Sequence, residues 1–509
     1  MNVVIARRVL SFCLALFCTC GIAATAFAHD VRLRIVTYNI EDDINGATAP
    51  LPGLITPFGS TNVLLGGVLE GIGEETLGTD KHAQPLDIIA LEETTSNPVT
   101  VQPIVNGLNA FYGTNRYALS TFQATESGGD TADGNGPNAI AYNTATVQLV
   151  ASVPVNPTSG SLGSSSGEYR QVMRYEFAPA GVTPAASNVF YIYVSHYKSG
   201  TTASDLTSRG KEAVIIRNDE AASLPANARV VYVGDYNVTT SGEASYITIL
   251  ATNSPSGIAQ GGGYDFSNPT GSTNVNWGTS TLLALKTEST TDLRYRDDFQ
   301  IMTSNVFFGV PGGLSLVTNT YHVFGNNGST PFQGNVSTSD SALNSSIPAG
   351  SPITAATLYH DLTNASDHLP VVADYTVTVP DPAPYQAWQL QYFGCTNCAQ
   401  AQTNADGDGT GQNNYFKFVA GLNPTNPASV FTFQITPGTN LSAGTTLAFG
   451  PAMIGRTYTP QVTTDLESGV WQSLTNLAVT PVTNSSQVSF TDTNTAAPQQ
   501  FYRIGISLQ

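Results

Sequence analysis

Apolar residues recur along the first 380 positions in short runs separated by polar and glycine-rich segments. Such runs, rich in Val, Ile, Phe and Tyr, predict β-strands. Strands are expected at Leu33–Ile40, Ile88–Leu91, Ala139–Tyr142, Phe190–Ser195, Val230–Val233, Phe299–Met302 and Val371–Tyr375. Helices are expected at Pro98–Ala110 and at Ser204–Ala222, where Ser204 can cap the first turn. This alternation predicts an α/β sandwich of mixed sheets, with long polar surface loops at 157–167, 255–280 and 323–352.

A proline-rich segment ends this first region. Prolines at 380, 382 and 384 stiffen the chain and remove strand hydrogen bonds. Beyond them, stretches such as Thr457–Val462 and Gln487–Phe490 alternate apolar and polar residues, which predicts a small all-β sandwich. The predicted organisation is a main domain over 29–379, a linker over 380–428 and a C-terminal β-sandwich domain over 429–509.

The first 28 residues have the pattern of an export signal. Arg7 and Arg8 form a charged start, Val9–Ile22 is apolar, and Ala26-Phe27-Ala28 is a small-x-small cleavage site. We therefore expect a mature chain from His29 that is secreted, either periplasmic or extracellular. No later stretch of the sequence approaches the roughly 18 apolar residues that span a bilayer.

The charge balance limits the classes of partner. Loss of Arg7 and Arg8 with the signal changes the formal net charge from −18 to −20. Such an acidic chain does not bind nucleic acid by charge alone, which argues against a DNA-coating protein. A nuclease is still allowed, because a bound divalent cation can supply the positive charge at the site.

The mature sequence keeps two cysteines, Cys395 and Cys398, in a C-x-x-C pattern. In an exported chain this spacing favours a local disulfide over a cytosolic redox pair. A zinc site would need two further ligands close by, and the neighbouring sequence offers none.

Residues with catalytic or metal-binding chemistry stand beside the apolar runs. Gly234-Asp235-Tyr236-Asn237 follows one run, and Ser366-Asp367-His368 precedes another. Carboxylate, amide and imidazole groups at converging strand ends can hold a divalent metal and orient a water at a phosphorus centre. The other candidates, in chain order, are Asn39, Glu93, Asn138, Tyr142, Arg170, His196 and Asp298.

Except for Arg170, these residues lie in seven short motifs, T-Y-N-I, D-I-I-A-L-E-E, N-A-I-x-Y, S-H-x-K-S-G, G-D-Y-N, R-x-D-F and S-D-H-x-P. Their order resembles the endonuclease/exonuclease/phosphatase superfamily, which has the fold of pancreatic deoxyribonuclease. The resemblance covers about residues 31–376, and seven motifs in one order are far more specific than any one of them. It implies a four-layer αββα sandwich.

The resemblance also implies a role for each residue. Glu93 and Asp367 would ligate Mg²⁺ (or Mn²⁺), with Asn39 close by. Asp235 would orient or deprotonate the attacking water, or share the metal, and Asn237 would hold a phosphate oxygen. His196 and His368 would be the two imidazoles beside the phosphate, and Asp298 would be the carboxylate partner of His368. Asn138, Tyr142 and Arg170 would contact the phosphate. Arg174 is an alternative to Arg170 for this contact.

Two positions depart from the family pattern. Glu92 stands where a glutamine is usual, so the site would carry extra negative charge if this side chain faces inward. Asp297 stands where an apolar residue is common, which leaves the Asp298 assignment open by one position. Alternation along a strand favours one of the two aspartates facing the site.

Residues 404–417 resemble a calcium-loop linker. Asp406, Asp408, Thr410 and Asn414 occupy ligand positions of an EF-hand-type loop, but Lys417 stands where a bidentate acid is needed. We therefore expect weak Ca²⁺ binding or none.

The leading hypothesis is a secreted, Mg²⁺-dependent phosphodiesterase, a nuclease that hydrolyses extracellular DNA or RNA, acting as a monomer. S-H-x-K-S-G resembles secreted bacterial nucleases of the superfamily. The first alternative is a sphingomyelinase or phospholipase C-like enzyme, or a phosphomonoesterase, for which the candidate lipid-facing aromatics are Phe58, Trp277 and Phe332. The second is an inactive domain carried by a C-terminal β module that binds a surface or a glycan.

Overall fold

The computed structural model describes residues 28–42, 64–113, 115–120, 137–155, 172–254, 262–266, 275–279, 281–310, 313–351, 353–380, 384–438, 444–465, 471–493 and 499–508. The predicted signal therefore lies outside the described residues, apart from Ala28. Contacts divide the chain into one unit over Ala28–Pro380 and another over Asp381–Gln509. Among the described residues, no helix is both long and apolar enough to cross a membrane.

The N-terminal unit contains a mixed sheet in the order β13-β15-β1-β4-β6-β5, with β14 paired to β15. Strands β1 and β4 run parallel, and β15 and β6 are antiparallel to them on either side. The strands are β1 Ala28–Asn39, β4 Ile88–Glu92, β5 Tyr117–Leu119, β6 Ala139–Asn143, β13 Leu314–Leu316, β14 His322–Val323 and β15 Val371–Pro380.

A second mixed sheet has the order β11-β12-β10-β9-β8-β7. Its central strands β9 and β10 run parallel, and β12 is antiparallel to β10. The strands are β7 Val147–Pro154, β8 Met173–Pro179, β9 Phe190–His196, β10 Val230–Asp235, β11 Gly263–Asp265 and β12 Asp298–Thr303, and a separate two-stranded ribbon joins β2 Thr76–Leu77 to β3 His82–Ala83.

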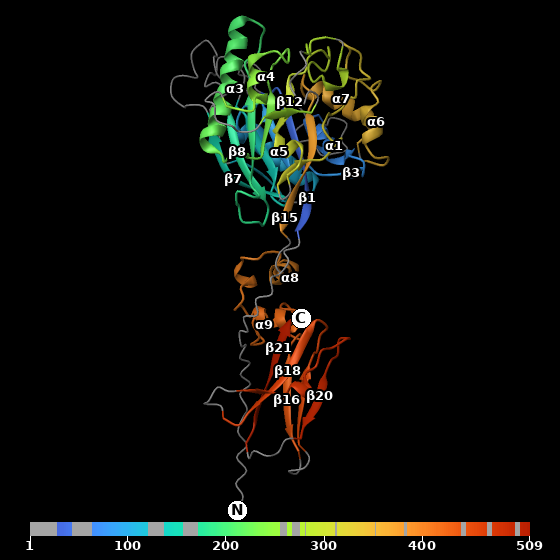
Figure 1. Cartoon of the computed structure of the whole chain (residues 1–509). Coiled ribbons are helices and arrows are strands. Elements are labelled where there is room, and N and C mark those ends of the chain that lie inside the picture. The colour runs from blue at the N-terminus through green and yellow to red at the C-terminus, as the bar shows by residue number, and fades with distance from the viewer. Residues whose placement is uncertain are drawn as a thin grey trace, which may run out of the picture. The chain divides into compact units, whose positions relative to one another are not determined.

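Side-chain alternation along β10 shows how the layers form. Val231 and Val233 pack into the core shared with the first sheet, whereas Val230 and Tyr232 pack on the other face with Ala213 of a helix. Helices cover the outer faces of both sheets: α3 and α4 lie beside the second, and α1 and α7 beside the first (Figure 1). The predicted αββα sandwich is therefore confirmed. The helices are α1 Leu65–Glu74, α2 Gln102–Phe111 after a π-helical turn at Asn97–Val101, α3 Ala203–Ser223, α4 Ala244–Leu250, α5 Ser304–Phe307, α6 Ala342–Ser346 and α7 Ala355–Ala365, with a 3₁₀ turn at Leu283–Leu285.

All seven predicted strands are present, but one predicted helix cap is wrong. Helix α3 is capped by Thr202, which accepts a hydrogen bond from the Asp205 amide in a capping box, and Ser204 lies inside the first turn. The loop predicted at 323–352 also contributes to the core, through Phe324, Val336 and Leu343. The loop at 157–167 lies outside the described residues.

The C-terminal unit contains two three-stranded sheets, in the orders β16-β17-β20 and β19-β18-β21, which confirms the predicted all-β part. Ala420 and Leu422 share a core with Phe449 and Tyr458, so part of the expected linker packs as one body with the strands. The elements are α8 Pro384–Phe393, a 3₁₀ turn at Ala399–Ala401, α9 Asn414–Ala420, β16 Thr432–Pro437, β17 Thr445–Gly450, β18 Arg456–Thr463, β19 Gln472–Ser473, a 3₁₀ turn at Thr475–Leu477, β20 Val488–Asp492 and β21 Phe501–Leu508.

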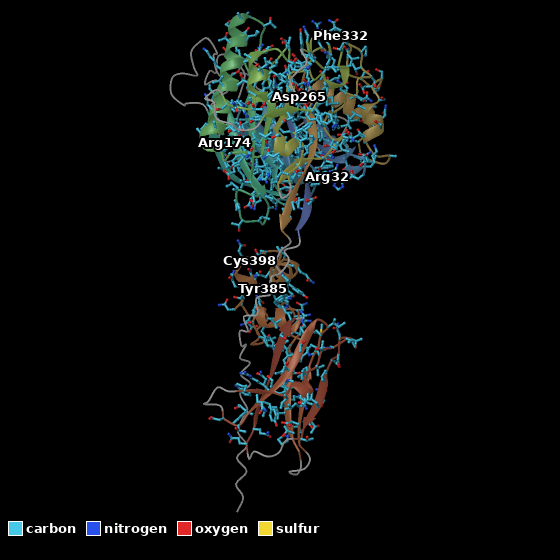
Figure 2. The ribbon with its side chains drawn as sticks, viewed as in Figure 1. Arg32, Arg174, Asp265, Phe332, Tyr385 and Cys398 are labelled. Carbon is cyan, nitrogen blue, oxygen red and sulfur yellow. A yellow bond between two sulfur atoms is a disulfide. The ribbon has the colours of Figure 1, made fainter. Side chains whose placement is uncertain are left out.

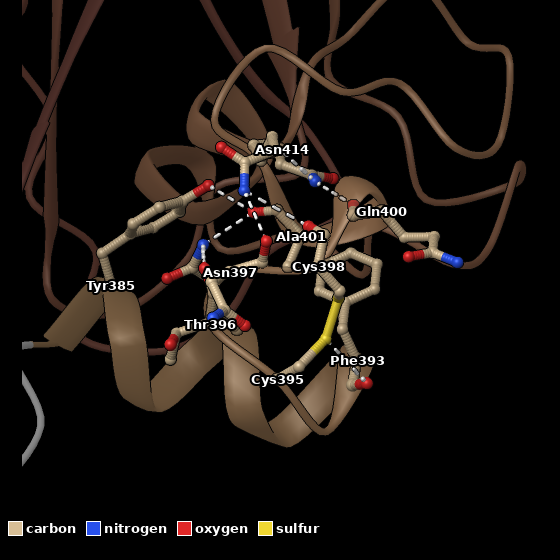
Figure 3. The surroundings of a disulfide bond; sticks show 11 residues. Tyr385, Phe393, Cys395, Thr396, Asn397, Cys398, Gln400, Ala401 and Asn414 are labelled. Carbon is tan, nitrogen blue, oxygen red and sulfur yellow. Dashed lines mark hydrogen bonds between the residues drawn. A yellow bond between two sulfur atoms is a disulfide. The ribbon is translucent and has the colours of Figure 1, made fainter. Parts of the chain in front are cut away.

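Cys395 and Cys398 form a disulfide, as the C-x-x-C spacing predicts. Figure 3 shows it at the end of a helix, beside a hydrogen-bonded loop. Asn414 donates to the carbonyls of Gln400 and Gln402 at 2.7 and 2.9 Å, so α9 is fastened to this loop. The segment is a structured part of the C-terminal unit.

Candidate active site

Seven strand ends meet at one edge of the sandwich. The parallel strands β1, β4, β9 and β10 bring their C-terminal ends there, and the antiparallel strands β6, β12 and β15 begin there. Asp235 is the register partner of His196 on one side and of Asp298 on the other. Neighbouring strands lie about 4.8 Å apart, so the register alone brings these three side chains together.

The Oδ2 atom of Asp235 lies at the centre of the site. It accepts a hydrogen bond from Nδ2 of Asn39 at 3.2 Å, and it lies 3.4 Å from Nε2 of His196 and 3.9 Å from Nε2 of His368. Glu93, His196 and Asp235 each offer a ligand atom, and these three atoms lie within 4.8 Å of one another. Two carboxylates and an imidazole at this separation can share a cation.

Asn39 presents its amide nitrogen, not its oxygen, to the carboxylates. Its Nδ2 donates to Glu93 Oε1 at 3.1 Å as well as to Asp235, while its Oδ1 accepts from the Glu41 amide at 3.1 Å. In this arrangement Asn39 holds two acidic side chains in place, and its role as a metal ligand stays a prediction. Its neighbour in the register is Glu92, at the end of β4.

His368 and Asp298 form a buried pair. Nδ1 of His368 lies 2.8 Å from Oδ2 of Asp298, and the Asp298 side chain is fully buried. This contact identifies Asp298, not Asp297, as the carboxylate partner of the histidine. Burial alone would lower the pKa of His368, but Asp298, with Asp235 and Asp367, raises it well above its usual value.

A second group of ligand atoms adjoins the first. Glu288, Asp367 and His368 each offer an atom within 4.8 Å of the others, and Nε2 of His368 is 3.7 Å from Asp367. The predicted metal ligands Glu93 and Asp367 thus fall into two adjacent groups, which Asp235 and His368 connect at 3.9 Å. The Asp367 side chain is 42% exposed, so this group opens to solvent.

Burial perturbs the carboxylates of the site. The pKa of Asp235 is raised to about 7 by burial, with Asp298, Glu288 and Glu93 adding to the effect and His368 opposing it. Its Oδ1 accepts from the Asn237 amide at 2.9 Å, and the Asn237 side chain donates to the Tyr197 carbonyl at 3.1 Å. Asp235 is therefore held firmly but gains a proton far more readily than an exposed aspartate.

Two acidic residues of the site, Glu41 and Glu288, escaped prediction as functional groups, and a third, Asp297, was considered only as the alternative to Asp298. Glu41 accepts from the Asp367 amide at 3.3 Å, and burial and Asp367 raise its pKa. Burial and a hydrogen bond with Glu288 raise the pKa of Asp297 well above its usual value. Glu41 follows the strand that carries Asn39 by two residues, so its place in the sequence could have indicated it, whereas Glu288 lies in an irregular loop that gives no such signal.

Glu92, in place of the usual glutamine, is fully buried and faces inward. Its Oε1 accepts from Thr37 Oγ1 at 3.0 Å. Burial raises its pKa well above the usual value, with Asp298 adding to the effect and the hydrogen bond from Thr37 opposing it. The side chain therefore faces inward as the expectation of extra charge requires, while its burial opposes that charge.

Not all predicted substrate contacts reach this edge. Asn138 lies at the site end of β6 and donates to the Val194 carbonyl at 3.2 Å. Tyr142 pairs with Ile88 at the far end of β4 and packs against Phe177, which does not support a phosphate contact. The motif places Tyr142 only four residues after Asn138 in the sequence, but four residues of a strand span roughly 13 Å, so the two side chains lie far apart.

Neither arginine predicted to contact phosphate is among the described side chains that meet at this edge. Arg174 is paired with Asp219 of α3, on the helix-covered face of its sheet (Figure 2). Arg170 lies outside the described residues. Of the aromatics weighed for a lipid-binding surface, Trp277 is buried against Tyr246, and Phe58 lies outside the described residues.

In the calcium-like loop, a lysine side chain supplies the positive charge. Lys417 forms an ion pair with Asp408, and both side chains are buried. The Asp406 carboxylate accepts from the amides of Thr410 and Gly411 at 3.1 and 2.7 Å. Asn414 donates its side-chain amide to backbone carbonyls as described above, and its place as a Ca²⁺ ligand stays a prediction.

The chain matches no protein-family model and no curated protein. Similar solved structures include the human Nocturnin catalytic domain with bound sulfate, 14% identical with a TM-score of 0.38 over 68% of this chain and 97% of that one. A humanized D. rerio TDP2 is 14% identical, with a TM-score of 0.36 over 68% and 98%. An endonuclease/exonuclease/phosphatase family protein from Bacteroides thetaiotaomicron is 12% identical, with a TM-score of 0.34 over 69% and 97%.

Proposed function

We propose that this chain is a secreted, metal-dependent phosphodiesterase of the endonuclease/exonuclease/phosphatase type, and that its substrate is nucleic acid. The observation that carries the proposal is the convergence of His196, Asp235, Asp298 and His368 within hydrogen-bonding or near-contact distance at one sheet edge. These residues come from four separate motifs. An inactive domain would have no need to bury so many mutually repelling carboxylates at one point.

The donor set fits a hard divalent cation. Carboxylates dominate both groups of ligand atoms, and imidazole is the other ligand type. Mg²⁺ and Mn²⁺ prefer oxygen ligands, and Asp367 is open enough for water to complete the coordination shell. Glu93, Asp235 and Asp367 are the residues proposed to hold the metal, which would supply positive charge at the phosphoryl oxygens.

The protein's own residues would activate water and stabilise the transition state. Asp298 fixes the tautomer of His368 by accepting from Nδ1, which directs Nε2 toward Asp235 and the reacting centre. Asp235 lies at the centre of the site, where it would orient the attacking water or take a proton from it. His196 and Asn237 flank it and would donate to the phosphate as negative charge develops.

Nucleic acid is favoured as the substrate because His196 lies in S-H-x-K-S-G, the motif that resembles secreted nucleases. The buried position of Trp277 removes one candidate for the lipid-facing surface that a sphingomyelinase would need. Export, a monomeric state and binding of a surface or glycan by the C-terminal strands stay predictions.

A substrate panel tests the proposal. Purified mature protein is incubated with single- and double-stranded DNA, RNA, a nitrophenyl phosphodiester and a nitrophenyl phosphomonoester, with Mg²⁺, Mn²⁺ or EDTA. We expect metal-dependent release of acid-soluble nucleotides and cleavage of the diester above the monoester. Cleavage of the monoester alone would instead support the phosphomonoesterase alternative for the same site.

A further inference from the structure

Two of the active-site loops are held by one buried side chain outside the motifs. The first loop, 196–200, follows β9 and carries His196; the second, 235–243, follows β10 and carries Asp235 and Asn237. Arg209 of α3 contacts both loops. Its side chain is fully buried although its guanidinium group is charged at any physiological pH.

The first set of contacts reaches the loop after β9. Nη1 of Arg209 donates to the carbonyls of Lys198 and Gly200, each at 2.8 Å. One turn further along α3, Glu212 accepts from the Lys198 amide at 3.1 Å. This loop contains the Tyr197 carbonyl, to which the Asn237 side chain donates, so its backbone position also sets the orientation of Asn237.

The second set reaches the loop after β10. Nε of Arg209 donates to Oε2 of Glu243 at 2.9 Å, and Nη2 lies 2.8 Å from the same oxygen. The other carboxylate oxygen of Glu243 accepts from the amide and hydroxyl of Thr239 at 2.8 and 2.7 Å. Thr239 is two residues from Asn237, so the ion pair fixes the loop on the far side of the catalytic asparagine.

Only a planar, multidentate donor can make these contacts together. Two nitrogens face one carboxylate while a third donates to two carbonyls, and a lysine ammonium is a single point that cannot reach both loops. A buried guanidinium also needs this many partners, since an unpaired buried charge is strongly destabilising.

We propose that Arg209 is a positioning residue that couples the loops after β9 and β10 and so holds His196 and Asn237 in register with Asp235. The inference rests on the proposed phosphodiesterase function, but the coupling it describes is a property of the fold and can be measured without turnover. A misplacement of about 1 Å at a catalytic group can cost on the order of 100-fold in rate.

The test compares Arg209→Lys with Arg217→Lys. Arg217 lies two turns further along α3, is equally buried, and bonds Glu220, the Tyr232 hydroxyl and the Ala251 carbonyl, which belong to neither loop. Both substitutions remove the guanidinium fork from the same helix, so their shared effect on stability is the control. The readouts are amide hydrogen exchange of peptides 197–202 and 236–243, melting temperature, and kcat and KM on the cleaved diester.

We expect Arg209→Lys to speed exchange in both peptides by about 10-fold or more and to lower kcat about 10- to 100-fold, with KM changed less than kcat. Arg217→Lys should lower the melting temperature and leave both peptides and kcat within about twofold of the parent. Equal exchange and equal kcat in the two variants would overturn the proposal.

Glu243→Gln covers the case in which Arg209→Lys does not fold. It keeps the Arg209 contacts to Lys198 and Gly200 and weakens only the second set, so faster exchange is expected in 236–243 and not in 197–202. Unchanged exchange in 236–243 would overturn the coupling. If the parent protein cleaves no substrate, the exchange data still decide the coupling, and the failure then belongs to the proposed function.

Discussion

The pair of Asp298 and His368 gives the sharpest quantitative prediction. Asp298→Asn keeps the shape of a fully buried side chain and removes its charge, 2.8 Å from Nδ1 of the imidazole. Asparagine can still accept from Nδ1 or present its amino group there, so the fixed tautomer is lost as well as the charge. The substitution acts directly on His368 and replaces none of the residues proposed to hold the metal.

The size of the effect follows from the geometry. Unit charges about 4 Å apart attract by about 4 kcal/mol at an effective dielectric constant of 20, so loss of the Asp298 charge lowers the pKa of His368. Asp235 and Asp367 lie 3.9 and 3.7 Å from the other ring nitrogen and keep part of the elevation. We therefore expect kcat to fall by about 10²–10⁴, the range for loss of a positioned acid or base.

The pH profile distinguishes this explanation from simple damage. Asp298 raises the pKa of His368, so its removal lowers that pKa. Whichever limb of the rate profile reports His368 must then move to lower pH in Asp298→Asn. Diester hydrolysis measured from pH 5 to 9 gives this limb directly.

A matched control is Asp374→Asn, another fully buried aspartate, whose partners are Arg32 and Arg34 of β1. It should destabilise the fold, because it breaks a buried ion pair, yet leave the limb where it was. The reasoning about the dyad is refuted if folded Asp298→Asn retains more than about a third of the parent kcat with an unmoved limb.

Three further predictions concern other residues. Asn39→Asp replaces two donated hydrogen bonds to Glu93 and Asp235 with charge repulsion, so its kcat should fall at least about 100-fold. The rise in KM of Asn39→Ala should be a smaller factor than this fall in kcat. Lys417→Glu should make the melting temperature of the C-terminal unit rise with Ca²⁺ and fall with EDTA in calorimetry, whereas the parent responds to neither. Burial raises the pKa of Glu70 to about 8, so the folded state binds this proton more tightly than the unfolded state does, and stability falls as pH rises from about 4.5 to 8. Glu70→Gln should abolish this dependence on pH. In urea unfolding at pH 8 it should stabilise the protein by roughly 1–3 kcal/mol.

The fold could be predicted because its strands are apolar runs whose ends carry the motifs. Val230–Val233 is buried on both faces, so its composition alone marks it as a central strand, and Asp235 follows at its end. Because the parallel strands β9 and β10 are neighbours that end at the same edge, His196 and Asp235 at their ends must lie next to each other. The capping box of Thr202 and Asp205 was also readable from the sequence, since the spacing of the two residues is its signature.

The features that could not be predicted from the sequence depend on the position of a residue along its strand, on irregular loops or on burial. Tyr142 belongs to a motif yet lies four residues from the site end of β6, and alternation gives the side of a sheet but not the position along it. Glu288 enters the site from a loop with no periodicity, so its contact with Asp367 and Asp297 follows only from the tertiary structure. The charge state of Glu92 depends on complete burial, which composition does not reveal.

The most direct test of the central claim is the rate of metal-dependent nucleic-acid hydrolysis by the parent protein, His368→Ala and His82→Ala, compared at equal folded concentration. His82 is an exposed histidine of β3 that bonds Gln84, so its substitution controls for loss of an imidazole elsewhere. The account predicts that EDTA and His368→Ala each abolish cleavage by the parent, while His82→Ala cleaves at the parent rate. Cleavage that persists in His368→Ala, or that needs no metal, would contradict it.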